Sequence, residues 1–400
     1  MDFNYSPKEE AFREEIRQWL AVNMKELPKW WNNPRVPAPD QGSEEYQQFS
    51  LWWHRKLYDA GYVGIAWPKE YGGRGATLME QVVFNEEMAK HRVPGPTNGH
   101  GIGWCGPAIM MHGAEWQKKR FLPKILRAEE IWCTCYSEPQ AGSDMANVQT
   151  RAVEDGGNFV VNGQKVWTSG GHYADWAVIL VRTDPTAPKH RGLSYLLMDM
   201  HSPGVTIRPL SQITGHAEYN EVFLDNVRIP KNQVVGQLNR GWYIAASALE
   251  FERSNVGASE RALQTVRDMI KMAQKTKRKG VPLSEDPVMR QKLAQLYIEA
   301  MIMRYNGLRN LTNQLRGEPP GPQMSIGKLF MSEHDMRAQH IGLEIQGLYS
   351  QLMRGSKHAI DNGRWQYRFL FAPGMLIAEG TSEIQRNVIA QRVLGLPRSY

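Results

Sequence analysis

The chain has 400 residues, of which 42% are hydrophobic and 22% are charged. A chain of this length and composition can bury a large core, and we expect a soluble globular protein with more than one domain. The formal net charge of +7 arises from basic residues interleaved with acidic ones, and the densest basic cluster, within residues 275–279, contains no aromatic residue. This distribution argues against nucleic-acid binding.

Signals for membrane insertion, secretion and metal binding are missing from the sequence. No uninterrupted run of about 18 apolar residues occurs, and the first residues, MDFNYSPKEEAFREEI, are acidic and amphipathic, unlike a secretory signal. Cys105, Cys133 and Cys135 fit neither a disulfide framework nor a zinc spacing. We therefore expect a cytoplasmic protein with buried thiols, without a metal site and without an integral membrane segment.

Residues 1–131 show the apolar spacing of helices. Ser6 and Glu9 have the spacing of a capping box, with a proline at the first helical position between them. Thr77 and Glu80 repeat the spacing before a second apolar stripe. The pattern predicts an all-helical N-terminal domain.

In residues 132–237 the apolar period shortens towards two, which is typical of strands. Asn162–Gly163 is a dipeptide that favours a type I′ turn, so we predict a tight hairpin there. Further β-rich segments complete a small, mostly antiparallel β domain, and the expected strands lie at residues 159–167, 175–184, 193–200, 205–210 and 221–229.

Helical periodicity returns in residues 238–400, with breaks at the Pro- and Gly-containing segments 279–287 and 317–322. The chain order is therefore helices, then strands, then helices. We predict an α+β multidomain fold in which long C-terminal helices form a bundle.

Two segments of the β domain have the chemistry of a ligand site. The loop CYSEPQAGSD, residues 135–144, contains Ser137 and Ser143 and offers backbone donors to an anionic or polar ligand. In VWTSGG, Trp167 presents a flat apolar face and Thr168 a hydroxyl, which together suit a heterocycle. Each segment taken alone is more often an ordinary structural element.

A third segment, EGTSEIQR, places a carboxylate before a helix. Ser382 and Gln385 have capping-box spacing, so Glu379 is predicted on the loop before the helix. Gly380 would allow this loop to approach a ligand closely. Taken alone, Glu379 could equally be a solvated residue near a positive helix end.

With these three motifs in this order, the chain resembles the acyl-CoA dehydrogenase family over essentially its whole length. The resemblance implies an N-terminal helical domain, a small central β domain and a C-terminal four-helix-type bundle, with boundaries near residues 131 and 237. It also implies substrate contacts from Ser143, Arg253 and Gly380. The FAD contacts that it implies come from Tyr136, Ser137, Gly142, Ser143, Trp167, Thr168, Thr381 and Glu383.

The reaction implied by the resemblance is α,β-dehydrogenation of an acyl-CoA thioester. In the family a glutamate, here Glu379, removes the α-proton while FAD accepts the β-hydride. The backbone N–H of that glutamate and a ribityl hydroxyl of FAD stabilise the charge on the thioester oxygen. The family further implies a homotetramer that passes its electrons to electron-transfer flavoprotein.

Glu252 is a second candidate base, because it falls on the apolar stripe of a predicted helix. A carboxylate on such a stripe must be paired or functional. Some family members place their base there in an L-x-x-E-R setting, which Leu249 to Arg253 match, but those members typically lack the glutamate before G-T. We therefore expect Glu379 to be the base, and Glu252 to be a polar pocket residue, an arginine partner or an alternative base.

The sequence also departs from the family pattern. Thr276 to Gly280 replace the R-x-x-F-G segment that reaches a neighbouring subunit's FAD, and Glu344, Gly347 and Leu348 replace Q-x-x-G-G. An acyl-CoA oxidase, a nitroalkane-oxidase-like enzyme and a non-catalytic subunit of a hetero-oligomer remain alternatives. A branched, cyclic or otherwise bulky acyl group is the preferred substrate class.

Overall fold

The computed structural model describes residues 4–33, 36, 39, 43–250, 256–318 and 321–397. They divide into two compact units, which we call the helical unit and the sheet unit. The helical unit comprises Met1–Ala38, Thr77–Val93 and Ser254–Tyr400, and the sheet unit comprises Pro39–Ala76 and Pro94–Arg253. Within the described residues, no helix has both the length and the apolar character needed to cross a membrane.

In the helical unit, the sequence predicted the starts of two helices correctly. Both capping boxes are present: Ser6 and Glu9 begin α1, and Thr77 and Glu80 begin α4. The helices of this unit are α1 (Pro7–Asn23), α2 (Lys29–Asn32), α4 (Leu78–Lys90), α8 (Val256–Lys275), α9 (Pro287–Leu315), α10 (Met324–Gln346), α11 (Arg364–Ile377) and α12 (Ser382–Val388).

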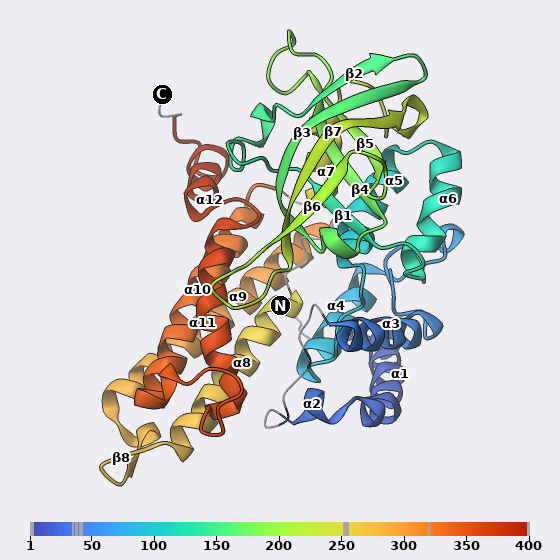
Figure 1. Cartoon of the computed structure of the whole chain (residues 1–400). Helices are drawn as coiled ribbons and strands as arrows, with labels where there is room; N and C mark the ends of the chain where they lie inside the picture. Colours follow the sequence, from blue (N-terminus) through green and yellow to red (C-terminus); the bar gives the residue numbers. More distant parts are fainter. Residues whose placement is uncertain are drawn as a thin grey trace. The chain divides into compact units, whose positions relative to one another are not determined.

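The helices α8 to α11 form the C-terminal bundle, and Figure 1 shows them as long neighbouring helices. Their shared core includes Val266, Met269, Leu296 and Trp365, all nearly or fully buried. The predicted break at residues 279–287 contains the short strand β9 (Val281–Pro282), which pairs with β8 (Lys277–Arg278) just before the break. Burial of this apolar core, more than local propensity, stabilises the helices.

The sheet unit combines a seven-stranded sheet with α3 (Glu44–Asp59), α5 (Gly106–His112), α6 (Glu115–Leu126) and α7 (Gly241–Glu250). The strand order is β1-β4-β2-β3-β7-β6, with β5 paired to β4. The pairs β1–β4 and β2–β4 are parallel, and the other pairs in this sheet are antiparallel. The strands are β1 (Trp132–Cys135), β2 (Arg151–Asp155), β3 (Asn158–Ser169), β4 (Trp176–Arg182), β5 (Leu193–Asp199), β6 (Val205–Leu210) and β7 (Tyr219–Pro230).

The predicted hairpin at Asn162–Gly163 is wrong, because β3 runs straight through this dipeptide. The turn lies earlier, where Gly156 and Gly157 connect the paired residues Asp155 and Asn158 of β2 and β3. Gly163 instead lies at an irregularity of the β3–β7 register, and a Cβ atom there would be 2.5 Å from Thr150 Oγ1. Close backbone approach, rather than a turn, explains this glycine.

The fold class predicted from the sequence is confirmed: helices precede and follow a mostly antiparallel β domain. The strands expected at residues 175–184, 193–200, 205–210 and 221–229 all occur, with shifts of a few residues at their ends, whereas the two runs expected within residues 159–167 form the single strand β3. All three cysteines are buried free thiols, as expected. The domain boundaries near residues 131 and 237 stay a prediction.

Candidate active site

In the sheet unit, the first predicted ligand segment leaves the end of β1. Tyr136 is buried, and its hydroxyl lies 2.7 Å from the Tyr195 hydroxyl. Burial raises the pKa of Tyr136 well above its ordinary value, so this phenol stays neutral. Beyond it, a tight turn closes between Glu138 and Ala141, whose backbone groups hydrogen-bond at 3.1 and 3.0 Å. Gly142 and Ser143 follow at the exposed end of this loop.

The second predicted segment contains a β-bulge. The β3–β7 register shifts between Lys165 and Thr168, so that one extra residue is accommodated on β3. Trp167 takes up this shift with φ +62°, and its side chain is 60% exposed. A left-handed conformation is costly for an aromatic residue. The bulge therefore turns a large apolar ring out of the sheet, where it can face a ligand.

Thr168 has the opposite orientation to Trp167. Its side chain is fully buried, and its Oγ1 lies 3.8 Å from Cys135 Sγ. The Thr168 carbonyl accepts a hydrogen bond of 2.9 Å from Asn220 Nδ2. Thr168 thus anchors the strand beside the bulge, and its hydroxyl belongs to the core.

A buried ion pair joins the two predicted segments of the sheet unit. The Lys165 ammonium donates to Glu138 Oε1 at 2.9 Å, to the Tyr136 carbonyl at 3.1 Å and to the Leu180 carbonyl at 2.7 Å. Both side chains are almost completely buried. The Val166 backbone N–H also donates to the Ser137 carbonyl at 2.9 Å. The loop after β1 and the bulge on β3 are therefore held to each other.

Both carboxylate oxygens of Glu138 accept hydrogen bonds. Its carboxylate accepts from the backbone N–H groups of Gln149 and Thr150 at 2.7 and 2.8 Å, and from Thr150 Oγ1 at 2.6 Å. Burial opposes ionisation, but the Lys165 charge and these donors leave the pKa of Glu138 below its usual range. Inside the sheet unit, the ionised Glu138 paired with the protonated Lys165 is therefore more stable than the neutral pair.

In the helical unit, Glu379 lies in the turn between α11 and α12. Its φ is +57°, and the φ of Gly380 is +91°, so both residues are left-handed. For glycine this conformation is ordinary, but for glutamate it is uncommon and requires support from its surroundings. A Cβ atom on Gly380 would lie 2.6 Å from Gln385 Nε2, so a larger residue here would also displace the Gln385 side chain. The turn presents an exposed glutamate immediately before a helix.

The predicted capping box of Ser382 and Gln385 is wrong by one residue. The N-cap of α12 is Thr381, whose hydroxyl accepts from the Ile384 backbone N–H. Gln385 points back instead and donates to the carbonyls of Glu379 and Gly380 at 3.0 and 3.3 Å. The glutamine therefore stabilises the left-handed turn rather than a helix end.

A buried lysine completes this turn. Lys328 of α10 is 9% exposed, and its ammonium donates to the Gly380 carbonyl at 2.7 Å and to the Met375 carbonyl at 3.1 Å. Burial lowers the pKa of Lys328, whereas the charges of Glu379 and Glu383 oppose that shift. The predicted base thus has a cation in its immediate electrostatic environment.

The remaining predicted residues fall into two sets. Thr381 and Glu383 belong to the start of α12, where the pKa of Glu383 is lowered by its own backbone N–H and by the Thr381 side chain. Glu252 and Arg253 lie outside the described residues. The structure therefore brings the predicted residues together as two groups, one around Trp167 in the sheet unit and one around Glu379 in the helical unit.

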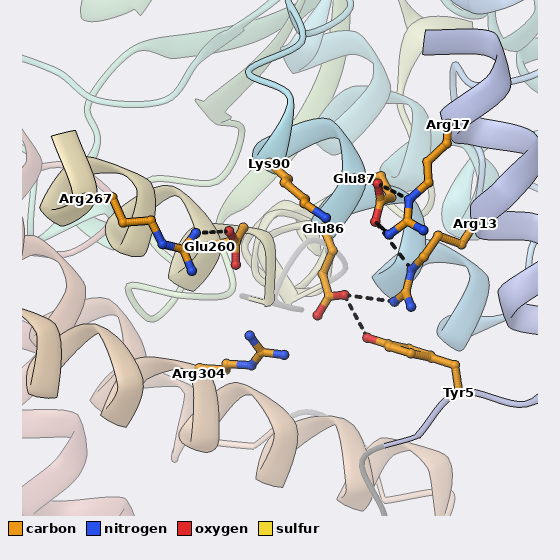
Figure 2. A pocket seen from close by; sticks show the side chains of 9 residues that line it. All are labelled: Tyr5, Arg13, Arg17, Glu86, Glu87, Lys90, Glu260, Arg267 and Arg304. Carbon is orange, nitrogen blue, oxygen red and sulfur yellow. Dashed lines mark hydrogen bonds and ion pairs between the residues drawn. The ribbon is translucent and has the colours of Figure 1, made fainter. Parts of the chain in front are cut away.

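A polar hollow of about 290 Å³ also occurs in the helical unit, and Figure 2 shows charged side chains from several helices around it. Glu86 accepts from the Tyr5 hydroxyl at 2.8 Å and from Arg13 at 3.2 Å, while Arg267 pairs with Glu260 at 3.1 Å. No residue predicted for the active site lines it. We interpret this hollow as part of the ion-pair network that connects the N-terminal segment, α1 and α4.

Sequence reasoning missed the residues that hold the two groups in shape. Neither Lys165 nor Lys328 belongs to a recognisable motif, and nothing in the local sequence indicates that Gln385 bonds to backbone carbonyls. A lysine at a position that alternation assigns to the core of β3 could have flagged Lys165, because a charge there must be paired. Positive φ at Trp167 and Glu379 has no local signal, since neither residue type favours it.

Family models match nearly the whole chain. The N-terminal, middle and C-terminal domains of acyl-CoA dehydrogenase match residues 6–129, 133–227 and 239–394. A relative called acyl-CoA dehydrogenase IpdE1, from Mycolicibacterium smegmatis, is 38% identical over 97% of this chain and 98% of its own length.

Solved structures agree with the sequence comparison. A chain of the "Tcur3481-Tcur3483 steroid ACAD" superposes with a TM-score of 0.85 at 29% identity, over 100% of both chains. A chain of the ChsE4-ChsE5 complex from Mycobacterium tuberculosis does so with a TM-score of 0.83 at 30% identity, again over 100% of both chains. On this similarity in sequence and fold, the chain belongs to the acyl-CoA dehydrogenase family.

Proposed function

We propose that this protein is an FAD-dependent dehydrogenase that converts an acyl-CoA thioester into the trans-2-enoyl-CoA, with Glu379 as the base. The observation that carries the proposal is the left-handed Glu379–Gly380 turn. It exposes the Glu379 side chain, and Lys328 and Gln385 hold its backbone by hydrogen bonds. Such strained, over-determined backbone is typical of functional sites.

The residues of the sheet unit fit a flavin. Trp167 offers an exposed aromatic face, and the loop that ends in Ser143 is tied to the same strand. Ser137, Gly142, Ser143 and the backbone of Tyr136 and Thr168 would hold the cofactor there. Thr381 and Glu383, which belong to the helical unit, are FAD contacts that we propose from the family resemblance alone. Bound FAD would supply the two-electron acceptor for the hydride of the β-carbon.

The chain itself must remove a proton. Because the α-proton of a thioester is a far weaker acid than a carboxylic acid, its removal requires donors at the thioester oxygen. The Glu379 backbone N–H is the donor that we propose, and Gly380 leaves the room that such close approach needs. The Glu379 side chain would take the proton, while Ser143 and Arg253 would contact the substrate.

For the acyl group we propose a bulky polycyclic or branched structure. This preference rests on the likeness to the structure that is called a steroid ACAD. A second carboxylate, Glu252, is present in the sequence beside the family's usual base position. Its role as a polar pocket residue or alternative base remains part of the proposal.

The electron acceptor that we propose is electron-transfer flavoprotein. The assembly is proposed as a homotetramer, and its rival is a hetero-oligomer of the kind named for the ChsE4-ChsE5 complex. Size-exclusion chromatography of the chain expressed alone would separate the two, because a hetero-oligomer would need a partner chain to assemble. The cytoplasmic location stays a prediction.

The decisive experiment is anaerobic titration of the purified flavoprotein with a panel of straight-chain, branched and polycyclic acyl-CoA thioesters. We expect the oxidised flavin absorbance to bleach with at least one bulky thioester and to recover slowly in air. A protein that binds FAD but is bleached by no thioester would contradict the proposal. Fast recovery in air would favour an oxidase.

Two variants assign the base. Glu379→Gln should slow flavin reduction by about 10³-fold or more, because the proton acceptor is lost while the shape is kept. Glu252→Gln is the matched control and should retain most of the rate. If the Glu379 variant keeps its rate and the Glu252 variant loses it, the base is Glu252.

A further inference from the structure

Lys328 joins the two ends of the segment that contains Glu379. Its ammonium donates to the Met375 carbonyl in the last part of α11 and to the Gly380 carbonyl just beyond Glu379. One buried side chain of α10 therefore fixes the backbone on both sides of the proposed base.

The turn depends on such a support. Glu379 has φ +57°, a conformation that an L-residue adopts only where the surroundings impose it. Gln385 provides a second support, since it donates to the Glu379 carbonyl at 3.0 Å. Lysine and glutamine together satisfy the two carbonyls of the left-handed pair.

The positive charge of Lys328 also acts electrostatically on nearby carboxylates, which a neutral hydrogen-bond donor would not do. A buried ammonium is costly, and its two carbonyl partners are neutral. The carboxylates that act on it electrostatically are Glu379 and Glu383. The other charged groups at this end of α10 and α12 are Glu333 and Arg386, which are paired with each other.

We propose that Lys328 is a positioning residue for Glu379: it holds the left-handed turn through the Gly380 and Met375 carbonyls, and its positive charge acts on the proposed base. This inference rests on the proposed function, because it takes Glu379 to be the proton acceptor. The proposed site then includes a residue of α10 that lies outside the EGTSEIQR motif.

The test compares Lys328→Met and Lys328→Gln with the control Lys271→Met, which removes an exposed lysine of α8. The first readout is hydrogen exchange of the holoprotein. In Lys328→Met the backbone amides of residues 378–386 should exchange about 10-fold faster or more, while those of the sheet unit keep the wild-type rate. Lys271→Met should match the wild type throughout.

The second readout is the pH profile of anaerobic flavin reduction. A carboxylate that loses a neighbouring cation is protonated more easily, so the acidic limb should move to higher pH by about one unit in both Lys328 variants. Lys328→Gln keeps a neutral donor, so its exchange should change less than that of Lys328→Met while its pH profile still moves. Loss of fixed structure alone would lower the rate without moving the limb.

Unchanged exchange in residues 378–386, or an acidic limb at the wild-type pH in both variants, would overturn the inference. If no thioester reduces the wild-type flavin, the proposed function fails and the catalytic half of the inference fails with it. The exchange comparison would then still decide whether Lys328 holds the turn, so the two failures are distinguishable.

Discussion

The bulge at Trp167 and the turn at Glu379 share two features, a left-handed residue and a nearby buried lysine, but the charges around the two lysines differ. Each holds a residue in a left-handed conformation, and a buried lysine lies beside each. Lys165 is bonded to a buried carboxylate as well as to two carbonyls. Lys328 is bonded to two carbonyls, and the carboxylates whose charge acts on it, Glu379 and Glu383, belong to the proposed site.

Because of this difference, Lys165 has a structural role, whereas Lys328 can influence the proposed active site. In the sheet unit the charge is neutralised by Glu138, so the pair fixes geometry and projects little field. Such buried pairs contribute little net stability but are costly to break from one side. In the helical unit the cation remains available to a carboxylate that must exchange a proton. Removing Lys165 should therefore mainly lower stability, whereas removing Lys328 should mainly change the activity of the proposed site.

The largest effect on stability is expected from Lys165→Met. It leaves Glu138 buried without its counter-ion, which should lower the free energy of unfolding by about 3–5 kcal/mol. Urea unfolding followed by circular dichroism measures this loss. Lys271→Met, which changes an exposed lysine, should stay within about 0.5 kcal/mol of the wild type.

The double variant Lys165→Met/Glu138→Gln tests the cause. With the charge of Glu138 also removed, a large part of the lost stability should return, because an uncompensated buried charge is no longer present. A double variant as unstable as Lys165→Met would show that packing, not charge, makes this lysine necessary.

An intermediate effect on stability, with a large effect on activity, is expected from Gly380→Ala. The added Cβ meets Gln385 Nε2 at 2.6 Å and φ is +91°, so the turn must shift. Stability should fall by about 1–2 kcal/mol, and flavin reduction by about 100-fold, since small displacements of a base are costly. Stopped-flow absorbance and urea unfolding measure the two quantities.

Gly374→Ala is the matched control for this change. Gly374 lies within α11, and a Cβ atom there would have no neighbour within 4 Å. Alanine favours a helix, so stability should rise slightly while the rate stays the same. Equal losses of rate in both variants would contradict the importance of the left-handed turn.

The smallest effect on stability is expected from Trp167→Gly. Glycine removes the cost of the left-handed conformation, about 1 kcal/mol, and only an exposed ring is lost from the fold. The dissociation constant of FAD should nevertheless rise by about 10-fold, because an aromatic face is removed. Flavin fluorescence during titration of the apoprotein measures it, and unchanged FAD affinity would place the ring outside the cofactor site.

Local sequence signals predicted much of the fold because they act over a few residues. The capping boxes at Ser6 and Thr77 were found where a side chain and a backbone group three residues away satisfy each other. The strands were found because alternating apolar residues face one core. The same local reasoning misplaced the hairpin, since Asn162–Gly163 also occurs at a register irregularity inside a strand.

The sequence by itself determined the order of helices and strands, the family and the segments that carry the predicted site. Periodicity and short motifs are enough to predict these features, because each depends on residues that are close together in the sequence. Only the three-dimensional structure decided that Thr381 caps α12, that Gln385 turns back to the loop, and that Lys165 and Lys328 bond to the loop after β1 and to the turn after α11. Each lysine reaches partners 27 or 52 residues away, such as Glu138 and Gly380, and only packing brings such partners within hydrogen-bond distance. The Thr381 and Gln385 bonds span a few residues, but they depend on the left-handed turn that sets where α12 begins.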